Sequence, residues 1–273
     1  PINKLILFFP HYLELLAKRI NGKGDMNPNT NGEHKVLRNT IKRSDRKKFI
    51  YIDGGANIGE SSLKASYFGN HHNKKVQIIA IEPIKETFEA LKKNTKSIDI
   101  LLIKKALGSK SKPLKFRVDE ENPCSGRNAA LYHYYLSKEP VEIATQITLD
   151  QLALDLNLTH IDFLKLDIEG LELDAIIGAE KLMNNGAIDY IQLEYNQTWI
   201  LAEASLEKLL KFISGKKYLL YRIAPNELLK ISNYHYTIED FYYSNLLLVR
   251  EGCPLPLRCN REASPATISG EHQ

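Results

Sequence analysis

Cysteine is scarce in this sequence of 273 residues, which contains only Cys124, Cys253 and Cys259. Three cysteines are too few for the disulfide framework of a small secreted protein, and they lack the paired spacing of a zinc site. The sequence therefore predicts a protein of a reducing compartment, the cytoplasm.

The sequence also lacks an apolar run long enough to cross a membrane. Its most apolar stretch, residues 5–9, is interrupted by Pro10 and followed by charged residues, whereas a membrane-spanning helix needs about 20 apolar residues. We interpret residues 1–48 as an N-terminal helical segment. Association with a membrane surface, and an anchor or signal upstream of the first residue, are left open.

A large charge imbalance is missing as well, because 37 basic and 33 acidic residues leave a formal net charge of +4. The densest basic cluster, residues 42–48, has no aromatic side chains between its charges that would stack on bases. The sequence therefore predicts no nucleic-acid partner. It leaves the oligomeric state open.

What the sequence does contain is a glycine-rich turn directly after an apolar run that ends at Asp53. Gly54 and Gly55 have no Cβ, so the chain can turn sharply and a ligand can lie against bare backbone. The spacing from Gly55 through Asn57 to Gly59 differs from the dinucleotide fingerprint, which places a pyrophosphate at a helix N-terminus. It suits a cofactor that lacks a pyrophosphate and carries a positive charge, such as S-adenosylmethionine.

A second acidic residue, Glu82, follows the apolar run at residues 76–81. A carboxylate at this place can accept hydrogen bonds from two ribose hydroxyls. The alternative is that both features are ordinary strand-to-helix turns. Their occurrence at the ends of successive strands favours a cofactor site.

Three segments make the chain resemble the FkbM-type S-adenosylmethionine-dependent methyltransferases over roughly residues 33–215. These segments are YIDGGANIG at residues 51–59, TLD at residues 148–150, and FLKLDIEGLE at residues 163–172 followed by Gly178 and Ala179. The third is the most specific, because every element of the family pattern is present.

The resemblance implies a Rossmann-like class I methyltransferase fold (α/β), with a mostly parallel central sheet and an antiparallel edge hairpin. Strands that alternate with helices independently predict a parallel sheet with crossover connections. We place the methyltransferase domain at residues 49–250 and a disordered tail at residues 251–273. The expected strands lie at residues 49–53, 76–82, 100–105, 161–167, 188–194, 217–223 and 242–249.

The function that the resemblance implies is S-adenosylmethionine-dependent O-methylation of a hydroxyl group on a sugar, glycan or related natural product. The acceptor would thus be a small molecule or a glycan. Two other classes are kept as alternatives. A nicotinamide-dependent oxidoreductase is disfavoured by the glycine spacing, and a non-catalytic module that has kept the cofactor fold is disfavoured by Asp167.

Asp167 and Glu194, at the ends of neighbouring predicted strands, and His133, in an aromatic-rich loop, are the predicted catalytic residues; His235 is a further candidate base. Together with Asn196, the two acidic residues could hold a divalent ion, but no metal is favoured. Without one, either carboxylate could act as the general base, its pKa raised by the other charge. The predicted cofactor-binding residues are Asp53, Gly54, Gly55, Asn57, Gly59, Glu82 and Asp167.

The neighbours of Asp167 have mainly structural interpretations. Lys165 is expected to pair with a carboxylate, and Glu172 is expected to support the first turn of a helix. Glu169 has two interpretations that stay open, a helix cap and a catalytic group. Short strands near residues 114–118 and 141–145 flank a loop rich in Asn and Tyr, which is either a carbohydrate-binding surface over the crevice or a solvated loop.

Overall fold

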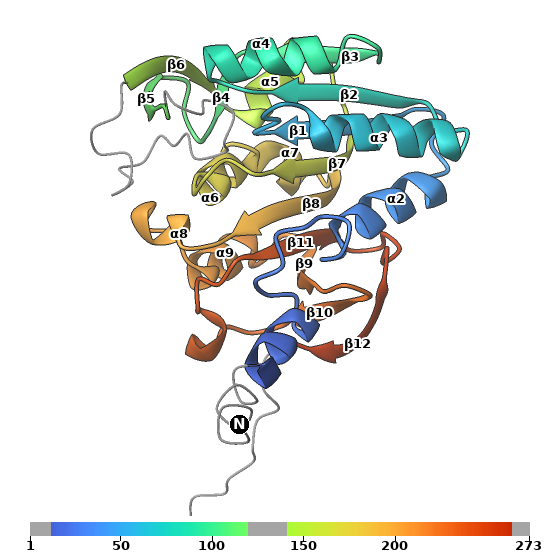
Figure 1. The fold of residues 1–273 in the computed structure, drawn as a ribbon, viewed down its shortest axis with the longest axis vertical. Coiled ribbons are helices and arrows are strands. Elements are labelled where there is room, and N and C mark those ends of the chain that lie inside the picture. The colour runs from blue at the N-terminus through green and yellow to red at the C-terminus, as the bar shows by residue number, and fades with distance from the viewer. Residues whose placement is uncertain (1–11, 120–140, 264–273) are drawn as a thin grey trace, which may run out of the picture.

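The computed structural model describes residues 12–119 and 141–263, and its centre is a nine-stranded sheet (Figure 1). The strand order is β12-β10-β9-β11-β8-β7-β1-β2-β3. The strands are β1 (Phe49–Gly54), β2 (Val76–Ile81), β3 (Ile100–Ile103), β7 (Ile161–Leu166), β8 (Ile188–Tyr195), β9 (Tyr218–Ile223), β10 (Glu227–Ile231), β11 (Ser244–Arg250) and β12 (Arg258–Glu262).

The five strands from β3 to β8 are parallel, and β11 is antiparallel to both of its neighbours, β8 and β9. This arrangement confirms the predicted class I methyltransferase fold. All six residues of β7 are buried, as expected for a central parallel strand whose two faces are both covered by helices.

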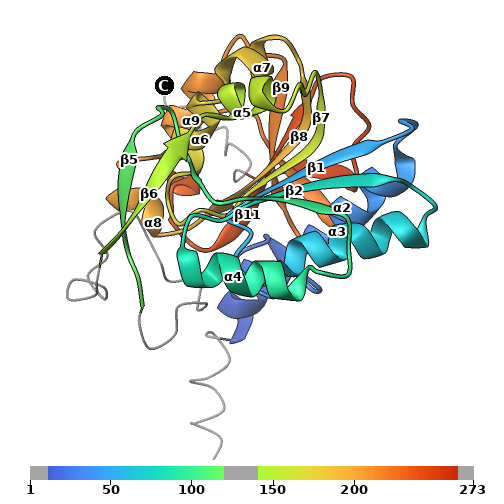
Figure 2. The ribbon, with the colours of Figure 1, turned by 90° about the horizontal axis from the view of Figure 1, so that it is seen from above.

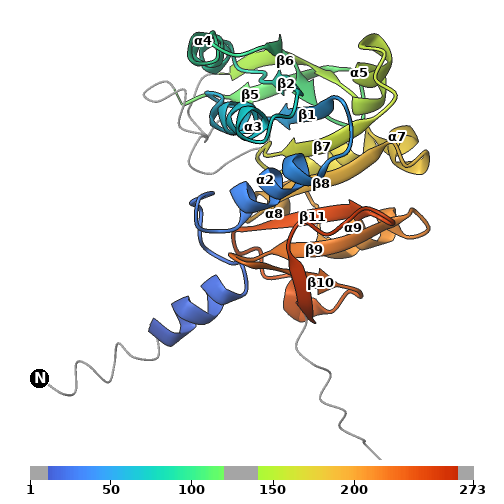
Figure 3. The same ribbon diagram turned by 90° about the vertical axis from the view of Figure 1, so that its right-hand side faces the viewer.

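Helices cover both faces of the sheet (Figures 2 and 3). A helix over residues 12–20 extends away from the sheet, and no helix among the described residues is both long and apolar enough to cross a membrane. The other helices are α2 (Glu33–Arg43), α3 (Glu60–His71), α4 (Lys85–Asn94), α5 (Leu149–Asp155), α6 (Glu172–Ile177), α7 (Glu180–Asn184), α8 (Thr198–Leu201), α9 (Leu206–Ile213) and the 3₁₀ turn η2 (Tyr236–Ile238).

The apolar side chains of successive strand residues alternate between two cores, because neighbouring residues in a strand point to opposite faces. On one face, Ile52 and Leu164 pack in the larger core with α5, α6, α7 and α9. On the other face, Tyr51 and Phe163 pack with α2 and α3. Because Val36 of α2 belongs to this second core, α2 is part of the same folded unit as the sheet.

Two residues of the TLD segment cap helices. Thr148 accepts a hydrogen bond from the backbone N–H of Gln151 at 3.1 Å and so caps α5. Asp150 accepts hydrogen bonds from the backbone N–H groups of Lys181 and Leu182, both at 3.0 Å, at the start of α7. These residues therefore have structural roles, since each satisfies N–H groups that a helix leaves unpaired at its N-terminus.

A smaller sheet stands beside the carboxyl ends of β1 and β2. Its strands β4 (Ala106–Leu107), β5 (Pro113–Arg117) and β6 (Val141–Ile147) have the order β4-β6-β5. The two short strands predicted on either side of the polar loop are thus present. Most of the loop, from residue 120 to residue 140, lies outside the described residues.

Two predictions at the C-terminal end are corrected. β9 and β11 pair antiparallel as expected, but β10 and β12 lie beyond β9, so the pair is not at the sheet edge. β10 is not among the expected strands, and residues 258–262, predicted to be disordered, form β12. β12 consists mostly of exposed polar residues, and it is held in the sheet by backbone pairing with β10. Its sequence therefore lacks the alternation of apolar and polar residues by which a strand is predicted.

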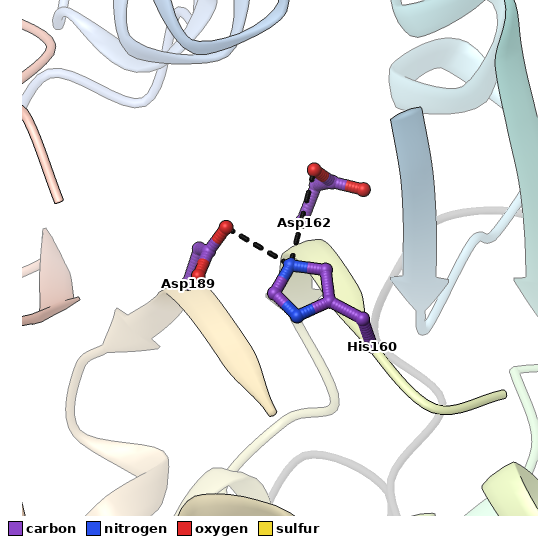
Figure 4. Close-up of side chains that lie close together, drawn as sticks. All are labelled: His160, Asp162 and Asp189. Carbon is purple, nitrogen blue, oxygen red and sulfur yellow. Dashed lines mark hydrogen bonds and ion pairs between the residues drawn. The ribbon is translucent and has the colours of Figure 1, made fainter. Parts of the chain in front are cut away.

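An ionic cluster lies at the amino ends of β7 and β8, opposite the ends where ligands bind in such folds. His160 Nε2 lies 2.9 Å from Asp189 Oδ2 and 3.9 Å from Asp162 Oδ1 (Figure 4). Arg250 Nη2 donates to Asp189 Oδ1 at 2.6 Å, and Arg46 Nε lies 3.0 Å from Asp162 Oδ1. Although the three residues of Figure 4 are close enough to bind a metal ion, two guanidinium groups already neutralise both carboxylates. We assign the cluster a structural role.

Replacing Asp189 by Asn is expected to lower the free energy of unfolding by about 2 kcal/mol near pH 7. Burial of Asp189 opposes its ionisation, but hydrogen bonds from His160 and Arg250 outweigh burial and lower its pKa from 3.8 to about 2. Since the folded-state pKa is the lower one, the carboxylate stabilises the fold above about pH 4, and this stabilisation is lost as the pH falls toward 2. Urea unfolding at several pH values measures the effect.

The exposed Asp99 provides the control variant Asp99→Asn, which is expected to leave the unfolding free energy nearly unchanged. A cost of Asp189→Asn that stays constant between neutral and acidic pH would contradict the assigned ion pairs.

Candidate functional site

A cavity of about 310 Å³ lies at the carboxyl ends of β1, β2 and β7. This is where ligands bind in open α/β sheets. Polar lining residues follow each of these strands, and apolar ones come from β5 and from the segment before α2. The lining residues include Met26, Gly55, Asn57, Glu82, Lys105, Phe116, Asp167, Glu169 and Leu171.

The glycine-rich turn forms the floor of the cavity because it lies directly against the backbone that follows β7. Gly55 has a φ of 76°, and a Cβ there would collide with the backbone oxygen of Asp167. A Cβ on Gly54 would come within 2.7 Å of Leu107 Cδ1. Gly59, with a φ of 94°, begins α3 and lies against Leu91 of α4. Gly54 and Gly59 therefore shape the turn without lining the cavity.

Glu82 lies in the cavity wall as predicted, and only 6% of its surface is exposed. Its Oε2 accepts a hydrogen bond from the backbone N–H of Asn57, and its Oε1 accepts one from that of Ile84, both at 3.0 Å. Burial raises its pKa to about 7, although the two backbone donors oppose the shift. Each oxygen keeps a second lone pair for a ligand hydroxyl.

Asp53 does not reach the cavity surface, which corrects the expectation that it faces the crevice. It is fully buried, its Oδ2 accepts a hydrogen bond from Ser62 Oγ of α3 at 2.6 Å, and its Oδ1 has no hydrogen-bond partner among the described residues. Burial raises its pKa, which the nearby Lys165 opposes. Asp53 is therefore placed to hold α3 against β1 below the glycine-rich turn.

Lys165 and Asp167 form the expected ion pair, with 2.7 Å between Lys165 Nζ and Asp167 Oδ2. Lys165 is 8% exposed. Burial would lower the pKa of its ammonium, but the carboxylates of Asp167, Asp53 and Glu33 together raise it. The buried lysine is thus a fixed positive charge below the cavity.

Glu33 of α2 is a residue that sequence reasoning missed. Its Oε2 accepts a hydrogen bond from Gln192 Nε2 of β8 at 2.6 Å, and its Oε1 accepts one from Asn245 Nδ2 of β11 at 2.9 Å. All three side chains are buried. The signal for this contact was the presence of Gln192 and Asn245 in otherwise apolar strands, since buried amides need partners.

Three carboxylates meet beside the cavity. Atoms of Asp167, Glu169 and Glu194 all lie within 4.8 Å of one another. Glu194 does not line the cavity, and its Oε2 accepts a hydrogen bond from Asn196 Nδ2 at 3.0 Å. Burial and the other carboxylates raise the pKa of Glu194 well above its ordinary value.

We assign no metal ion to this acidic group. The Lys165 ammonium already neutralises Asp167. The oxygen of Asn196, which was the third candidate ligand, accepts hydrogen bonds at 2.7 Å from the backbone N–H and the hydroxyl of Thr198. These contacts occupy oxygens of two of the three predicted ligands, Asp167 and Asn196.

The loop after β7 distinguishes Glu169 from Glu172. Glu172 is fully buried and accepts hydrogen bonds from the backbone N–H groups of Ile168 at 2.8 Å and Gly170 at 3.0 Å, so it supports the loop before α6, whereas the expected role was support of the helix's first turn. Helix α6 begins at Glu172, so Glu169 is not at the helix start. It lies in the loop with a φ of 54° and lines the cavity.

The described residues that line the cavity include no histidine. His133 lies outside the described residues. His235 precedes η2, where it accepts a hydrogen bond from the backbone N–H of Thr237 at 3.4 Å, and it does not line the cavity. Met26 and Phe116 line the cavity, although the sequence had not assigned them to the site, and Glu169, whose interpretation was left open, lines it as well.

A family model described as the methyltransferase FkbM domain matches residues 53–223. Among curated proteins, none matches the chain. Similar solved structures include an S-adenosylmethionine-dependent methyltransferase from Agrobacterium tumefaciens, with 10% identity and a TM-score of 0.45, covering 82% of this chain and 63% of that one. They also include a human methyltransferase 10 domain containing protein, with 12% identity and a TM-score of 0.42, covering 83% and 84%. TrmK from M. capricolum, solved with S-adenosyl-homocysteine, has 10% identity and a TM-score of 0.37, covering 82% and 69%.

Replacing Gly55 by Ala is expected to weaken the binding of S-adenosylhomocysteine at least about tenfold, because the new methyl group pushes the turn away from Asp167. The left-handed backbone adds a cost of about 1–2 kcal/mol to folding. Titration calorimetry measures the affinity, and urea unfolding measures the stability.

Gly215→Ala is a matched control, since Gly215 has a φ of 78° and a Cβ there would meet nothing within 4 Å. It should show the conformational cost alone, with unchanged affinity. If the two variants have equal stability and equal affinity, the close approach of the turn to Asp167 is not a constraint on the site.

Proposed function

Because the chain belongs to the FkbM methyltransferase family, we propose that it transfers the methyl group of S-adenosylmethionine to a hydroxyl group of a sugar, a glycan or a related natural product. Membership of this family identifies the chain as an S-adenosylmethionine-dependent methyltransferase and removes the nicotinamide-dependent alternative. The observation that carries the proposal is the cavity that joins Gly55, Glu82 and Asp167 at the ends of three adjacent parallel strands.

The residues of the cavity fit S-adenosylmethionine. Gly55 lines the cavity with bare backbone and, because it has no Cβ, lets the turn lie against Asp167, while Glu82 offers a carboxylate to the ribose hydroxyls. Asp167 and Glu169 place carboxyl groups in the same cavity, toward which the positive groups of the cofactor can turn. When bound, the cofactor would supply a methyl group activated by a sulfonium centre.

The chain's own contribution to the reaction is positioning and proton removal. Methyl transfer requires the acceptor oxygen to lie in line with the methyl carbon and sulfur, with reacting atoms about 3–3.5 Å apart. No covalent bond to the protein is needed. A side chain that accepts the hydroxyl proton adds about 10²- to 10⁴-fold in rate. Asp167, which lines the cavity, would orient the reacting groups.

The lining of the cavity supports a neutral, hydroxyl-rich acceptor. Phe116, Met26 and Leu171 provide apolar surface in the same cavity as the carboxylates, which suits the apolar face and polar edge of a sugar ring. Among the described residues that line the cavity, Lys105 carries the one positive charge, whereas Glu82, Asp167 and Glu169 are acidic, so the wall offers little positive charge to the phosphates of a nucleic acid. This charge distribution supports the expectation of a small-molecule or glycan acceptor.

Replacing Glu82 by Gln is expected to weaken the binding of S-adenosylhomocysteine about tenfold or more, because hydrogen bonds from the ribose to a charged group are lost. With its pKa near 7, wild-type Glu82 should bind the cofactor more tightly as the pH rises through neutrality and the carboxylate ionises. The variant should lack this dependence, which titration calorimetry across the pH range measures. Glu89→Gln, at an exposed site on α4, is the control, and equal affinities in all three proteins would refute the role of Glu82.

The acceptor class is tested with isotope-labelled S-adenosylmethionine and a panel of methyl glycosides, glycan fragments, polyols and RNA oligonucleotides. The expected result is label on one or more sugar hydroxyls, located by mass spectrometry. Labelling of RNA alone would contradict the proposed acceptor. Tight cofactor binding without transfer to any panel member would favour the non-catalytic alternative.

A further inference from the structure

We propose that Glu169 is the general base that removes the proton of the acceptor hydroxyl, an inference that rests on the proposed methyl transfer. Among the described residues, four carboxylates lie in or beside the cavity, those of Glu82, Asp167, Glu169 and Glu194. The contacts of each carboxylate show which of the four can act as a general base. Such a base must be accessible to the acceptor and must not already accept a hydrogen bond from a strong donor.

The other three carboxylates are occupied. Asp167 accepts from the Lys165 ammonium at 2.7 Å, so its Oδ2 is already held by a strong, charged donor. Glu82 accepts from two backbone N–H groups. Glu194 accepts from Asn196 and does not line the cavity.

The carboxylate of Glu169, in contrast, has no hydrogen bond and no ion pair in the part of the chain that the structure describes. It is not shut off from the cavity, since Glu169 lines it beside Asp167. It also lies within 4.8 Å of atoms of Asp167 and Glu194. Glu169 therefore combines access to the acceptor with an available lone pair.

The backbone fixes Glu169 in this position. Its φ of 54° lies in the left-handed region, and that of Gly170 is 101°. Glu172 holds the loop on both sides of Glu169 by accepting from the N–H groups of Ile168 and Gly170. A non-glycine residue pays about 1–2 kcal/mol for this conformation, and such costs are concentrated at functional sites. Because these two hydrogen bonds fix the backbone of the loop, they limit how far the Glu169 carboxylate can move away from the cavity.

The surrounding charges suit a base that works near neutral pH. Burial, followed by the charges of Asp167 and Glu172, raises the pKa of Glu169 to about 8. The charged groups around it are these two on its own segment, Glu194 on β8, Lys165 on β7 and, across the cavity, Lys105. Because the ionised form is the base, the reaction should speed up as the pH rises toward 8.

The proposed step conserves atoms and charge. The acceptor O–H bond breaks and its proton goes to a Glu169 oxygen, while the acceptor oxygen forms a bond to the methyl carbon. The carbon–sulfur bond breaks, and its electron pair stays on sulfur. The positive charge of the sulfonium and the negative charge of Glu169 are thus lost together, so the net charge of the cavity is unchanged.

The first test needs no acceptor. Titration calorimetry in phosphate and in Tris, two buffers with different ionisation enthalpies, gives the number of protons released when the wild type binds S-adenosylmethionine or S-adenosylhomocysteine. The sulfonium should displace a proton from Glu169, so S-adenosylmethionine should release more protons than the neutral product. Any protons that Glu82 releases are expected to be the same with both ligands, so they cancel when the two proton counts are subtracted. Glu169→Gln should abolish the difference, and the control Glu89→Gln should retain it.

The second test uses the methyl glycoside that is most rapidly labelled in the acceptor panel. Glu169→Gln should lower kcat about 10²- to 10⁴-fold with little change in the affinity for S-adenosylhomocysteine, and Glu169→Asp should recover part of the loss. In the wild type, log kcat should rise with pH up to about pH 8, and Glu169→Gln should lack this rise.

Each failure has its own meaning. If neither ligand binds to the wild type, the proposed function fails. If both bind but Glu169→Gln keeps the difference in proton release, or keeps the pH-dependent rise in kcat, Glu169 is not the base. Loss of wild-type activity in a chelator, with recovery on adding Mg²⁺, would also overturn the proposal, because the acidic group would then bind a metal ion.

Discussion

The site depends on the close contact between the backbones that follow β1 and β7. The N–H of Asp167 donates to the oxygen of Gly54 at 3.0 Å, and Gly55 leaves no room for a Cβ against the oxygen of Asp167. This contact sets the floor of the cavity and the position of the loop that carries Glu169. Any side chain at Gly55 would separate the two strand ends, so the glycine is required by geometry and not only by the turn.

Below this floor, a buried polar layer crosses the apolar sheet. Asp53, Lys165 and Gln192 lie side by side in register on β1, β7 and β8, and Asn245 of β11 and Glu33 of α2 extend the layer. Removing such groups from water is costly, and each needs partners. The layer therefore adds little net stability, but it specifies how α2 and the strands fit together and it places Lys165 next to Asp167.

The features that the sequence predicted well are those that local patterns control. Continuous apolar runs located the core strands β1, β2, β7 and β8, and the glycine spacing located the turn between β1 and α3. The features it missed depend on which face of an element meets another. Asp53 accepts a hydrogen bond from Ser62 of α3, and the side-chain oxygen of Asn196 accepts one from Thr198. Glu33 is hydrogen-bonded to residues more than 150 positions away in the sequence. The orientation of Glu169 follows from a left-handed backbone, which no pattern of apolar residues indicates.

The hydrogen bond between Glu33 and Asn245 joins residues separated by 212 positions. Contacts of such high sequence separation slow folding, because a long loop must close before they form. During synthesis, α2 leaves the ribosome early, but the hydrogen bond between its buried Glu33 and Asn245 can form only after β11 has been made. The domain is thus expected to complete its polar layer late in translation.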